Sequence, residues 1–409
     1  MHWKGGDLTA EEQVKVIERH TAQIYRREEL LEKLERSLNT GVPLRVKLGI
    51  DATGRDIHLG HTVVLRKLRQ FQDLGHLAVL IIGDYTALIG DPSERETARP
   101  KLTYDQIKEN MATYLEQMSQ IVDMDKAEVF YNGDWFKKMT FKDVLHLASK
   151  MTVARMLERE DFSQRYEKGT PIGLHEFLYP LMQSFDSVMV TADVELGGTE
   201  QTFSLMVGRD LQRDVGQEPQ VALTMPILIG TDGKKRMGKS LKNYIGITEP
   251  PQEMFGKLMS LPDDVMRGYF ELLTDKTDEQ IDELLSEDFH PRQAKSIVAK
   301  EIVSQFHSPQ AGEKAAQEFD RIFREGRLPS EIPAVEIESK ELKEGKMWVV
   351  SLLSRTGLVS SHSEARRLIS AGAVRIDKKQ VKDPEISVAL KEGMVVQVGK
   401  KKFSRISLI

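Results

Sequence analysis

The sequence predicts an α/β fold: a parallel sheet covered by helices comes first, an all-helical region follows, and a small α+β module ends the chain. Two apolar runs, 44–50 and 77–82, are expected to be buried strands, and the stretch 58–74 between them has helical spacing. Strand–helix–strand alternation of this kind gives parallel strands joined by right-handed crossovers. Ligands of such sheets bind beyond the carboxyl ends of the strands, so a site is expected at the loops at Asp51 and 83–92.

Helix-end residues and apolar periodicity define the remaining elements. A capping box from Thr9 to Glu12 predicts one helix that runs to about Leu38 and ends at Gly41. Further helices are expected over 104–122, 139–165, 174–186 and 199–215, and a further strand over 221–225. These elements divide the chain into a domain of residues 1–245 with an inserted helical segment at about 139–175, a helical domain over 246–329, a linker over 330–345 and the small module over 346–409.

Composition indicates a globular chain that does not cross a membrane. Apolar residues make up 40% and charged residues 30% of the chain, which excludes a disordered protein. The longest strongly apolar run, 77–82, is far shorter than the about 20 residues of a membrane-spanning helix. Residues 1–10 lack the apolar core of a secretory signal, and the chain has no cysteine. Disulfides and thiolate metal sites are therefore excluded, and a cytoplasmic location is expected.

Charge is distributed unevenly along the chain. Residues 340–409 hold 15 Lys and Arg against 7 Asp and Glu, a net charge of +8, so the rest must sum to −13 to give the overall −5. A basic module on an acidic body suggests that a polyanion is bound at that end. A basic surface that is merely solvated would look the same, and charge alone does not separate the two interpretations.

The first motif with chemical meaning is His58-Leu-Gly-His61, which follows a buried strand and opens a helix. A helix N-terminus offers free backbone N–H groups and the positive end of its dipole to phosphates. Gly60 allows a nucleotide to approach closely, and imidazoles three residues apart lie on one helix face, where they can donate to phosphoryl oxygens. Two surface histidines are the alternative, which the position after a buried strand disfavours.

A second motif, Lys234-Lys-Arg-Met-Gly-Lys239-Ser240, is preceded by Gly230-Thr-Asp-Gly233. Glycines on both sides of concentrated positive charge indicate a loop that closes over an anion. Taken alone, the segment is better explained as a solvated basic turn. Its occurrence in the same domain as the histidine motif favours the functional interpretation.

A third pattern consists of Tyr179, Gln183 and Asp186, at i, i+4 and i+7 on one face of an expected helix. A helix face is usually core, and neighbouring apolar residues can supply that core. Glutamine and aspartate on an inward face would lack partners unless a ligand pairs them. The spacing alone leaves both interpretations open.

Together these motifs resemble the class I aminoacyl-tRNA synthetases, which carry a His-Ile-Gly-His type motif and a Lys-Met-Ser-Lys-Ser type motif. Here the two stand as His58-Leu-Gly-His61 and Arg236-Met-Gly-Lys239-Ser240. Within that class the chain is similar to the bacterial tyrosyl-tRNA synthetases over 46–60, 82–93, 151–166, 178–186, 197–201, 243–251 and the C-terminal module. The resemblance implies a Rossmann-like catalytic domain, an all-α domain on the anticodon side and a ribosomal-type RNA-binding domain.

The resemblance also implies a reaction: ATP activates tyrosine as tyrosyl-adenylate, and the tyrosyl group then passes to the terminal adenosine of tRNA(Tyr). The catalytic residues would be His58, His61, Arg236, Lys239 and Ser240. The ATP-binding residues would be Gly49, Asp51, Thr53, Gly60, Gly198, Glu200 and Lys239. ATP is expected to bring Mg²⁺ with it, and neither a permanently bound cofactor nor a protein-only metal site is expected.

For tyrosine, the resemblance implies that Tyr179 and Gln183, with Asp91, hold the ammonium group and that Asp186 accepts the hydrogen bond of the phenol. Phenylalanine would leave that buried acceptor unpaired. Lys47 stands where another branch of the family has a phenol-binding tyrosine. The expected tyrosine site is therefore Asp91, Tyr179, Gln183, Asp186, Gln201 and Lys47.

The C-terminal module resembles the RNA-binding domain of the family at Ser363-Glu-Ala-Arg366-Arg367-Leu-Ile-Ser-Ala-Gly372. The residues expected to face RNA are Arg366, Arg367, Lys378, Lys379, Lys400, Lys401 and Lys402. This interpretation decides the charge question in favour of RNA. The family also implies a homodimer, whose interface is expected at 139–165 because that segment is more apolar than one helix requires.

Departures from the family pattern and rival functions complete the prediction. Arg236 and Gly238 replace a lysine and a serine, Glu200 replaces an aspartate, and Ala52 replaces a frequent proline. A tryptophan-specific sister enzyme would normally lack the C-terminal module and the Asp186 acceptor. A small-molecule nucleotidylyltransferase would need no RNA module, and the intact motifs argue against a non-catalytic RNA-binding paralogue.

Overall fold

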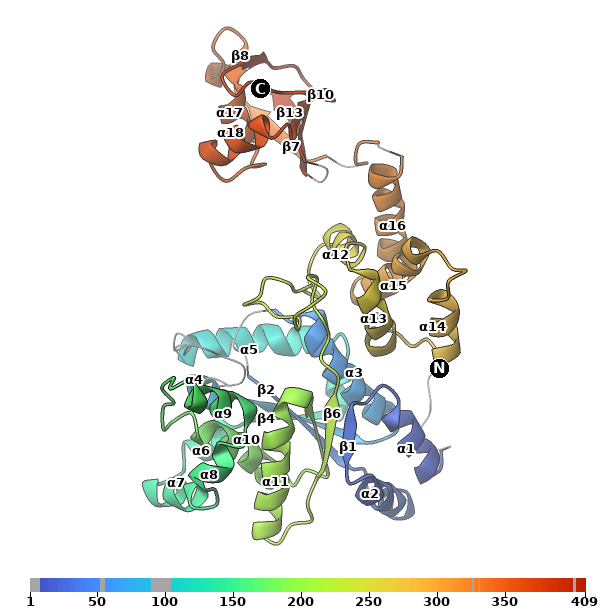
Figure 1. Ribbon diagram of the computed structural model, residues 1–409, viewed down its shortest axis with the longest axis vertical. Helices are drawn as coiled ribbons and strands as arrows, with labels where there is room; N and C mark the ends of the chain where they lie inside the picture. Colours follow the sequence, from blue (N-terminus) through green and yellow to red (C-terminus); the bar gives the residue numbers. More distant parts are fainter. Residues whose placement is uncertain (1–7, 52–55, 90–103, 326, 331, 400–401) are drawn as a thin grey trace. The chain divides into compact units, whose positions relative to one another are not determined.

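The computed structural model describes residues 8–51, 56–89, 104–325, 327–330, 332–399 and 402–409 (Figure 1). The chain forms two compact units, Met1–Ala316 and Gln317–Ile409. Of the predicted site residues, Thr53, Asp91, Lys400 and Lys401 lie outside the described residues. In the part of the chain that is described, no helix is long and apolar enough to cross a membrane.

The larger unit is built on a six-stranded sheet with the order β1-β6-β5-β2-β3-β4. Its strands are β1 (Gln23–Tyr25), β2 (Arg45–Ile50), β3 (Leu77–Ile82), β4 (Ala127–Tyr131), β5 (Val194–Gly198) and β6 (Val221–Met225). Five strands are parallel, and β1 runs antiparallel to β6 at one edge. The runs predicted at 44–50, 77–82 and 221–225 are confirmed as β2, β3 and β6, whereas β4 and β5 are absent from the sequence prediction.

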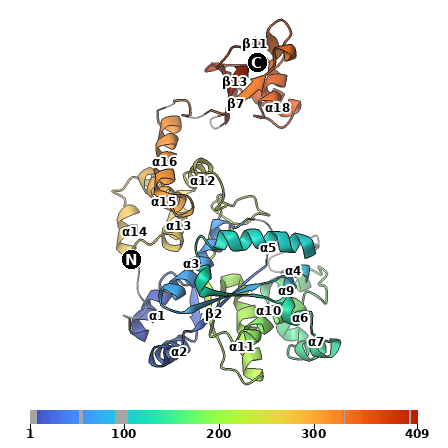
Figure 2. The same ribbon diagram turned by 180° about the vertical axis from the view of Figure 1, so that it is seen from behind.

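Helices cover both faces of this sheet (Figures 1 and 2). Those on one face are α3 (Leu59–Asp73) and α5 (Tyr104–Met118), and those on the other are α10 (Leu178–Met189) and α11 (Thr202–Asp214). Because β3 and β4 extend to one side of β2, and β5 and β6 to the other, the winding reverses between β2 and β5. Parallel sheets bind ligands at such a point. The predicted α/β class is confirmed.

The single helix predicted from Thr9 to about Leu38 is wrong, because a strand interrupts it. Two helices stand in its place, α1 (Ala10–Glu18), which the predicted Thr9 capping box opens, and α2 (Arg27–Thr40). Between them, His20 and Arg26 have positive φ values of 56° and 71°, outside the helical region. β1 lies between these two residues and pairs with the free edge of β6. Its partner is distant in sequence, so local helical spacing conceals it.

The inserted segment contains three short helices where one or two were expected: α7 (Phe141–Ala148), α8 (Val153–Met156) and α9 (Glu160–Glu167). The short helices α4 (Thr86–Ile89) and α6 (Gly133–Phe136) precede it. Thr140 and Thr152 each cap a new helix start, since their hydroxyls accept from the backbone N–H of Asp143 and Arg155. A capping side chain satisfies the first turn and so starts a helix afresh.

The helical prediction for 250–327 is confirmed by α12 (Pro251–Leu258), α13 (Met266–Leu273), α14 (Asp278–Leu284), α15 (Pro291–Phe306) and α16 (Pro309–Phe323). The described residues of that stretch include no strand. Tyr269 on α13 is fully buried, and its hydroxyl donates to the carbonyl of Ile229 at 2.7 Å. Arg66 on α3 pairs with Asp275. These bonds attach the helical region to the loop after β6 and to α3.

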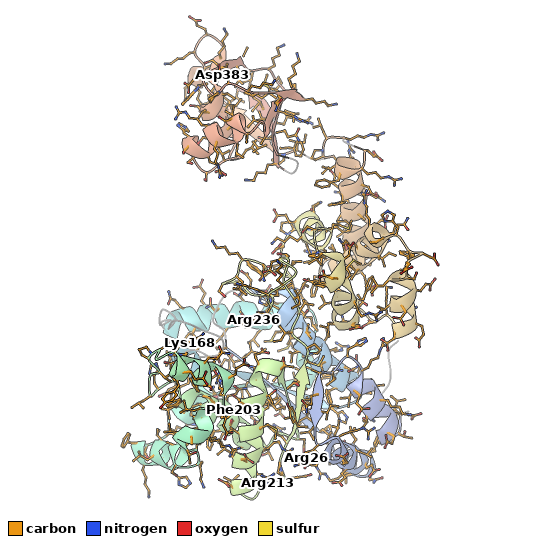
Figure 3. All side chains as sticks on the ribbon, in the orientation of Figure 1. Arg26, Lys168, Phe203, Arg213, Arg236 and Asp383 are labelled. Atoms are coloured by element: carbon orange, nitrogen blue, oxygen red, sulfur yellow. The ribbon has the colours of Figure 1, made fainter. Side chains whose placement is uncertain are left out.

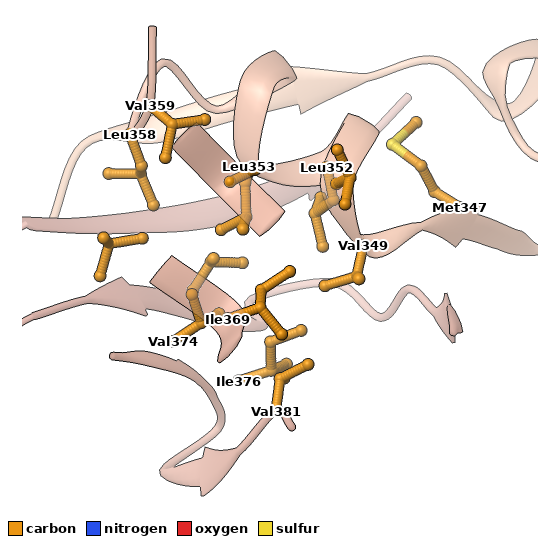
Figure 4. Close-up of a cluster of buried hydrophobic side chains, with 14 of the residues drawn as sticks. Met347, Val349, Leu352, Leu353, Leu358, Val359, Ile369, Val374, Ile376 and Val381 are labelled. Carbon is orange, nitrogen blue, oxygen red and sulfur yellow. The ribbon is translucent and has the colours of Figure 1, made fainter. Parts of the chain in front are cut away.

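The smaller unit is an α+β module, as predicted. Its elements are β7 (Ala334–Ile337), β8 (Lys346–Trp348), α17 (Val349–Arg355), α18 (His362–Ser370), β9 (Val374–Ile376), β10 (Lys379–Gln380), β11 (Ser387–Ala389), β12 (Val395–Val398) and β13 (Lys402–Leu408). Five strands form a sheet in the order β10-β9-β12-β13-β7, and β8 pairs with β11. Leu353, Ile369 and Val374 lie in its core, where helices and sheet meet (Figure 4).

The prediction of an irregular linker over 330–345 is wrong for 334–337, which form β7. This strand pairs in parallel with β13, from Ala334 opposite Arg405 to Ile337 opposite Leu408. Ile337 is fully buried in the core of the smaller unit. Prolines and acidic residues around the strand hide its pattern in the sequence. About a quarter of the expected linker therefore belongs to the module.

Candidate active site

A cavity of about 520 Å³ lies at the carboxyl ends of β2 and β5, where the winding of the sheet reverses. Its walls come from the exits of β2 and β3, the start of α3, one face of α10, the turn after β5 and the loop after β6. The predicted site residues that line it are Gly49, Asp51, His58, Gly60, His61, Tyr179, Gln183, Asp186, Gly198, Glu200, Gln201, Arg236, Lys239 and Ser240. Segments far apart in the sequence thus face one space.

His58 and His61 form one wall of the cavity. Their rings stack with centroids 3.7 Å apart, and the backbone N–H of His58 donates to Nδ1 of His61 at 3.2 Å. Burial, reinforced by the charge of Lys239, lowers the pKa of His58 to about 4, and burial lowers the pKa of His61 well below its usual range. Both rings are therefore neutral near pH 7. Nδ1 of His58 is buried without a partner among the described residues, and a ligand can supply one.

The loop after β6 faces the histidines and is fixed at its base by Asn243. The buried Asn243 side chain donates to the carbonyl of Arg236 at 2.9 Å and accepts from the N–H of Gly238 at 2.9 Å. Backbone hydrogen bonds between 57–59 and 245–247 tie the end of the loop to the start of α3. The two conspicuous sequence motifs are therefore held beside one another.

Positive charge and open space meet between the loop and α3. Arg236, labelled in Figure 3, lies on the loop with Lys239, and the Lys239 ammonium is 5.6 Å from the centre of the Tyr114 ring. A Cβ at Gly60 would lie 3.0 Å from the His58 ring, tighter than ordinary contact. Glycine therefore keeps the space beside this ring clear. A cationic loop opposite neutral N–H donors suits a phosphate chain.

The other end of the cavity is closed by a buried carboxyl group, that of Asp186. It accepts from Nε1 of Trp135 at 3.0 Å and from Nδ2 of Asn132 at 3.3 Å. Burial raises the pKa of Asp186 to about 7, while Lys47 acts in the opposite direction. A carboxylate can accept more than two hydrogen bonds. Asp186 is therefore suited to accept one from a hydroxyl group of a ligand.

Asp51 lies between these two ends, directly after β2. Its carboxylate accepts from the Tyr179 hydroxyl at 2.9 Å and from the Thr86 hydroxyl at 2.8 Å. A Cβ at Gly83 would lie only 1.9 Å from this carboxylate, so the exit of β3 requires glycine there. Gln183, one turn along α10 from Tyr179, also faces the cavity. This middle region offers an anion and polar oxygens to a cationic group.

The turn after β5 forms the remaining wall. The backbone N–H of Gly198 donates to Oε1 of Gln201 at 2.9 Å, which fixes the start of the 3-10 helix Thr199–Gln201. Glu200 is exposed at the rim. A Cβ at Gly49, at the exit of β2, would meet no atom within 4 Å, so backbone and ligand can approach closely there.

Comparisons with known proteins identify the family of this chain. Residues 39–324 match the family of class I tRNA synthetases (W and Y), and residues 347–396 match the S4 domain. The tyrosine–tRNA ligase of Carboxydothermus hydrogenoformans is 52% identical over 401 residues, which cover 96% of this chain and 97% of that protein. That of Thermotoga maritima is 49% identical over 404 residues and 98% of each chain. This chain belongs to the tyrosine–tRNA ligase family.

A solved structure of a tyrosyl-tRNA synthetase has the same fold as this chain. The tyrosyl-tRNA synthetase of Archaeoglobus fulgidus, determined with L-tyrosine, has a TM-score of 0.61 and 22% sequence identity. The match covers 75% of this chain and 99% of that one. At this identity the likeness supports the fold alone.

Lys47 differs from the other described residues of the predicted tyrosine site, because it does not line the cavity. Its buried ammonium donates to the Gln183 carbonyl at 2.8 Å, to the Ser187 hydroxyl at 2.7 Å and to Oε1 of Glu195 at 2.8 Å. Side chains alternate along β2, and that of Lys47 enters the layer between the sheet and α10. It lies beneath the cavity, where its three partners are groups of the protein.

Sequence reasoning missed the residues that hold the polar groups of the site. Asn132 and Trp135 bind Asp186, and Thr86 links Asn132 to Asp51 through hydrogen bonds of 3.0 Å and 2.8 Å. Both Asn132 and Trp135 follow β4, whose sequence at 127–131, apolar except for Glu128, was the available signal. A strand predicted there would have its carboxyl end beside that of β3, next to the cavity.

The predicted RNA-facing residues lie in the smaller unit. The Arg366 guanidinium stacks 5.1 Å from the centre of the Trp348 ring and lies 3.6 Å from Glu385. Arg367 is exposed on α18, Lys378 has a positive φ of 68° in the turn before β10, and Lys379 is exposed on β10. Lys402 donates to the carbonyl of Leu358 at 3.2 Å. Of the predicted residues, the S4 match covers Arg366, Arg367, Lys378 and Lys379 but not 400–402.

Trp135→Phe tests the hydrogen bond that holds Asp186. The substitution keeps an aromatic ring but removes a donor to the charged form, so the pKa of Asp186 should rise further above about 7. Carbon-13 NMR titration of the Asp186 carboxyl group measures the change, and Trp348→Phe in the other unit is the control. An unchanged midpoint in Trp135→Phe would contradict the assigned bond.

Proposed function

We propose that this protein acts as a tyrosine–tRNA ligase, which activates tyrosine with ATP and transfers it to tRNA(Tyr). One observation carries the proposal: a single cavity has a phosphate-suited wall at His58, His61 and Lys239 and a buried hydroxyl acceptor, Asp186, at its other end. The relatives at 52% and 49% identity carry this name. Tyrosine joined to a nucleotide fits both ends, because it has phosphate for the histidine wall and a phenol hydroxyl for Asp186.

In the first step, the tyrosine carboxylate attacks the α-phosphorus of ATP in line, and pyrophosphate leaves. The carboxylate is ionised at neutral pH, so no general base is needed. Catalysis then consists of positioning and of stabilising negative charge on the leaving group. ATP enters as its Mg²⁺ complex. His58 and His61 donate to its phosphates from one side, while Arg236, Lys239 and Ser240 bind them from the other.

Substrate binding extends these roles along the cavity. Asp186 accepts the phenol hydrogen bond, and Tyr179 and Gln183, with Asp91, bind the ammonium group. Gln201 faces the tyrosine carboxylate. The exits of β2 and β5 hold the adenylate through Gly49, Asp51, Thr53, Gly60, Gly198 and Glu200. Gly238 gives the loop more backbone freedom than the usual serine, and Glu200 reaches the ribose with one methylene more than aspartate.

In the second step, the terminal ribose of the tRNA attacks the adenylate. The C-terminal module binds the tRNA backbone through Arg366, Arg367, Lys378, Lys379, Lys400, Lys401 and Lys402, consistent with the net +8 of residues 340–409. The helical region 246–329 faces the anticodon side. The cytoplasm, where tRNA is charged for translation, is the proposed location.

The proposed enzyme is a homodimer whose interface includes the segment 139–175. Large apolar side chains of this segment are exposed: Phe141, Leu145, Val153, Tyr166 and Leu174. Leu174 is 83% exposed and Phe141 76%. A concentration of exposed apolar groups marks an interaction surface, and closed symmetric dimers are the commonest assembly of such chains.

The direct test is tyrosine-dependent exchange of labelled pyrophosphate into ATP, with phenylalanine and tryptophan as controls. Exchange with tyrosine and not with the other two is the expected result, because only tyrosine pairs Asp186 while fitting the cavity. Exchange that prefers tryptophan would assign the sister specificity instead. Absence of exchange with all three would reject the ligase activity.

Lys239→Ala should slow adenylate formation by about 10²–10³-fold, because one preorganised cationic donor to the leaving phosphates is lost. Tyrosine affinity should stay near that of the wild type, since Lys239 lies at the phosphate end. Single-turnover kinetics and tyrosine titration separate the two quantities. Lys234→Ala removes the same charge from an exposed position of the same loop and is the matched control. An unchanged activation rate in Lys239→Ala would remove this residue from the mechanism.

Phe141→Asp combined with Leu174→Asp should convert the dimer into monomers, because charged groups replace apolar contacts. Light scattering after size-exclusion chromatography gives the mass. Val42→Asp is the control, since Val42 is 63% exposed outside the segment. A wild-type protein with the mass of one chain, or a double variant that stays dimeric, would contradict this interface.

A further inference from the structure

Two oppositely charged side chains face each other in the centre of the sheet. Lys47 on β2 and Glu195 on β5 are direct partners in the parallel register, and both are buried, at 0% and 1% exposure. The Lys47 ammonium lies 2.8 Å from the Glu195 carboxylate. Burying one such charge without the other is strongly unfavourable, so the two belong together. Apolar side chains could fill these two positions of the sheet, so packing alone does not require charged residues there.

Each member of the pair is also bound to the layer of α10. Lys47 donates to the Gln183 carbonyl and to the Ser187 hydroxyl, and Ser187 donates to Oε2 of Glu195 at 3.0 Å. The same carboxylate oxygen accepts from the side chain of Gln220. The network therefore links β2, β5 and α10 beneath the cavity, and a rotation of α10 about its axis would break it.

The bonds to α10 flank the residue that closes the cavity. Gln183 and Ser187 lie one turn apart on α10, and Asp186 lies between them in sequence. Gln183 and Asp186 both face the cavity, whereas Ser187 faces the sheet. Lys47 therefore fixes the helix face that is directed at tyrosine, from the side opposite the ligand.

We propose that Lys47 and Glu195 form a positioning pair for amino-acid selection, in which Lys47 orients α10 and its charge favours the anionic form of Asp186, while Glu195 limits that effect. The proposal rests on the function proposed above. It makes the pair a determinant of the preference for tyrosine over phenylalanine, although neither residue touches the substrate.

The electrostatic part depends on what surrounds Asp186. Burial raises its pKa, Lys47 opposes the rise, Asn132 and Trp135 oppose it through hydrogen bonds, and Glu195 adds to it. The elements packed around α10 carry further charged groups: Asp51 after β2, Asp84 after β3, Asp134 and Lys137 at α6, Lys142, Asp143 and His146 on α7, and Arg209, Asp210, Arg213 and Asp214 on α11. Lys137 pairs with Asp84 at 3.2 Å, and Arg209 pairs with Glu29 at 2.8 Å. Lys47 and Glu195 are the charged groups that act on the pKa of Asp186, and they act in opposite directions.

The ionisation of Asp186 matters because the two amino acids differ by one hydroxyl. An anionic Asp186 accepts a hydrogen bond from the tyrosine hydroxyl, whereas phenylalanine leaves the buried carboxylate without this hydrogen bond. A protonated Asp186 discriminates less. Discrimination should therefore be lost as the pH falls through the pKa of Asp186 and be complete above it.

The experiment compares Lys47→Met, Glu195→Gln and the double variant with the wild type. The kcat/KM of pyrophosphate exchange is measured with tyrosine and with phenylalanine from pH 5.5 to 8.5. In Lys47→Met, the midpoint of the acid limb for tyrosine should rise from about pH 7 by about one unit, because a favourable positive charge is lost. In Glu195→Gln it should fall by a similar amount, and the double variant should return towards the wild type.

Discrimination provides the second readout. At pH 6 the ratio of tyrosine to phenylalanine kcat/KM should fall about tenfold in Lys47→Met, since one unit of pKa changes the ionised fraction tenfold. In Glu195→Gln it should rise. A purely structural role predicts that both single variants weaken activity in the same direction, without opposite shifts in pH dependence.

Lys33→Met is the matched control. Lys33 is 1% exposed and pairs with Glu218 at 3.2 Å, but it lies on α2 and away from the cavity. It should lower thermal stability without moving the acid limb. If Lys47→Met does not fold, Glu195→Gln and the double variant still decide the question.

Opposite shifts in the two single variants support the proposal. Shifts of the same sign, or none, in folded variants of an enzyme that activates tyrosine would overturn it. A wild type without tyrosine-dependent exchange would instead reject the proposed function. The carboxyl resonance of Asp186, titrated by NMR, would then still test whether the pair sets its ionisation.

Discussion

The parallel pairing of β2 with β5 is the constraint on which the rest of the structure depends. Its register sets Val46 opposite Val194 and Leu48 opposite Leu196, so the exit of β2 at Gly49 lies beside the exit of β5 at 197–198. The winding of the sheet reverses here, and the cavity lies above the two exits. The same register makes Lys47 and Glu195 neighbours and thereby supports the floor of the cavity.

The cavity separates two electrostatic environments. Neutral histidine N–H groups and the cations of the loop after β6 occupy one end, and the carboxyl group of Asp186 closes the other. Burial acts in opposite directions on the two groups, because it lowers the pKa of His58 and raises that of Asp186, and in each case it favours the uncharged form. At Asp186, two hydrogen-bond donors and the charge of Lys47 counteract the effect of burial. Phosphate chemistry and side-chain recognition can therefore proceed in one space without the charges of one end neutralising the other.

Much of the fold and site could be predicted from local sequence, and the failures share one physical cause. Continuous apolar runs identify β2, β3 and β6, and a helix start after β2 places His58 correctly beside the loop of Lys239. β1 and β7 are edge strands whose partners are distant in sequence, so local pattern does not reveal them. The family position of Lys47 predicts a ligand contact, but a strand sequence does not say which side chain on the neighbouring strand it will meet. The roles of Asn132 and Trp135 are hidden for the same reason, since both donate hydrogen bonds to Asp186, which is distant in sequence.

A crystal structure with a non-hydrolysable analogue of tyrosyl-adenylate would show whether one cavity holds both substrates end to end. We expect the phenol oxygen within hydrogen-bond distance of Asp186, the adenosine at 198–200 and the phosphate mimic at the exits of β2 and β5. We also expect Lys47 to stay beneath α10 without contact to the ligand. A phenol group directed away from Asp186, or Lys47 turned into the cavity to bind it, would contradict the account.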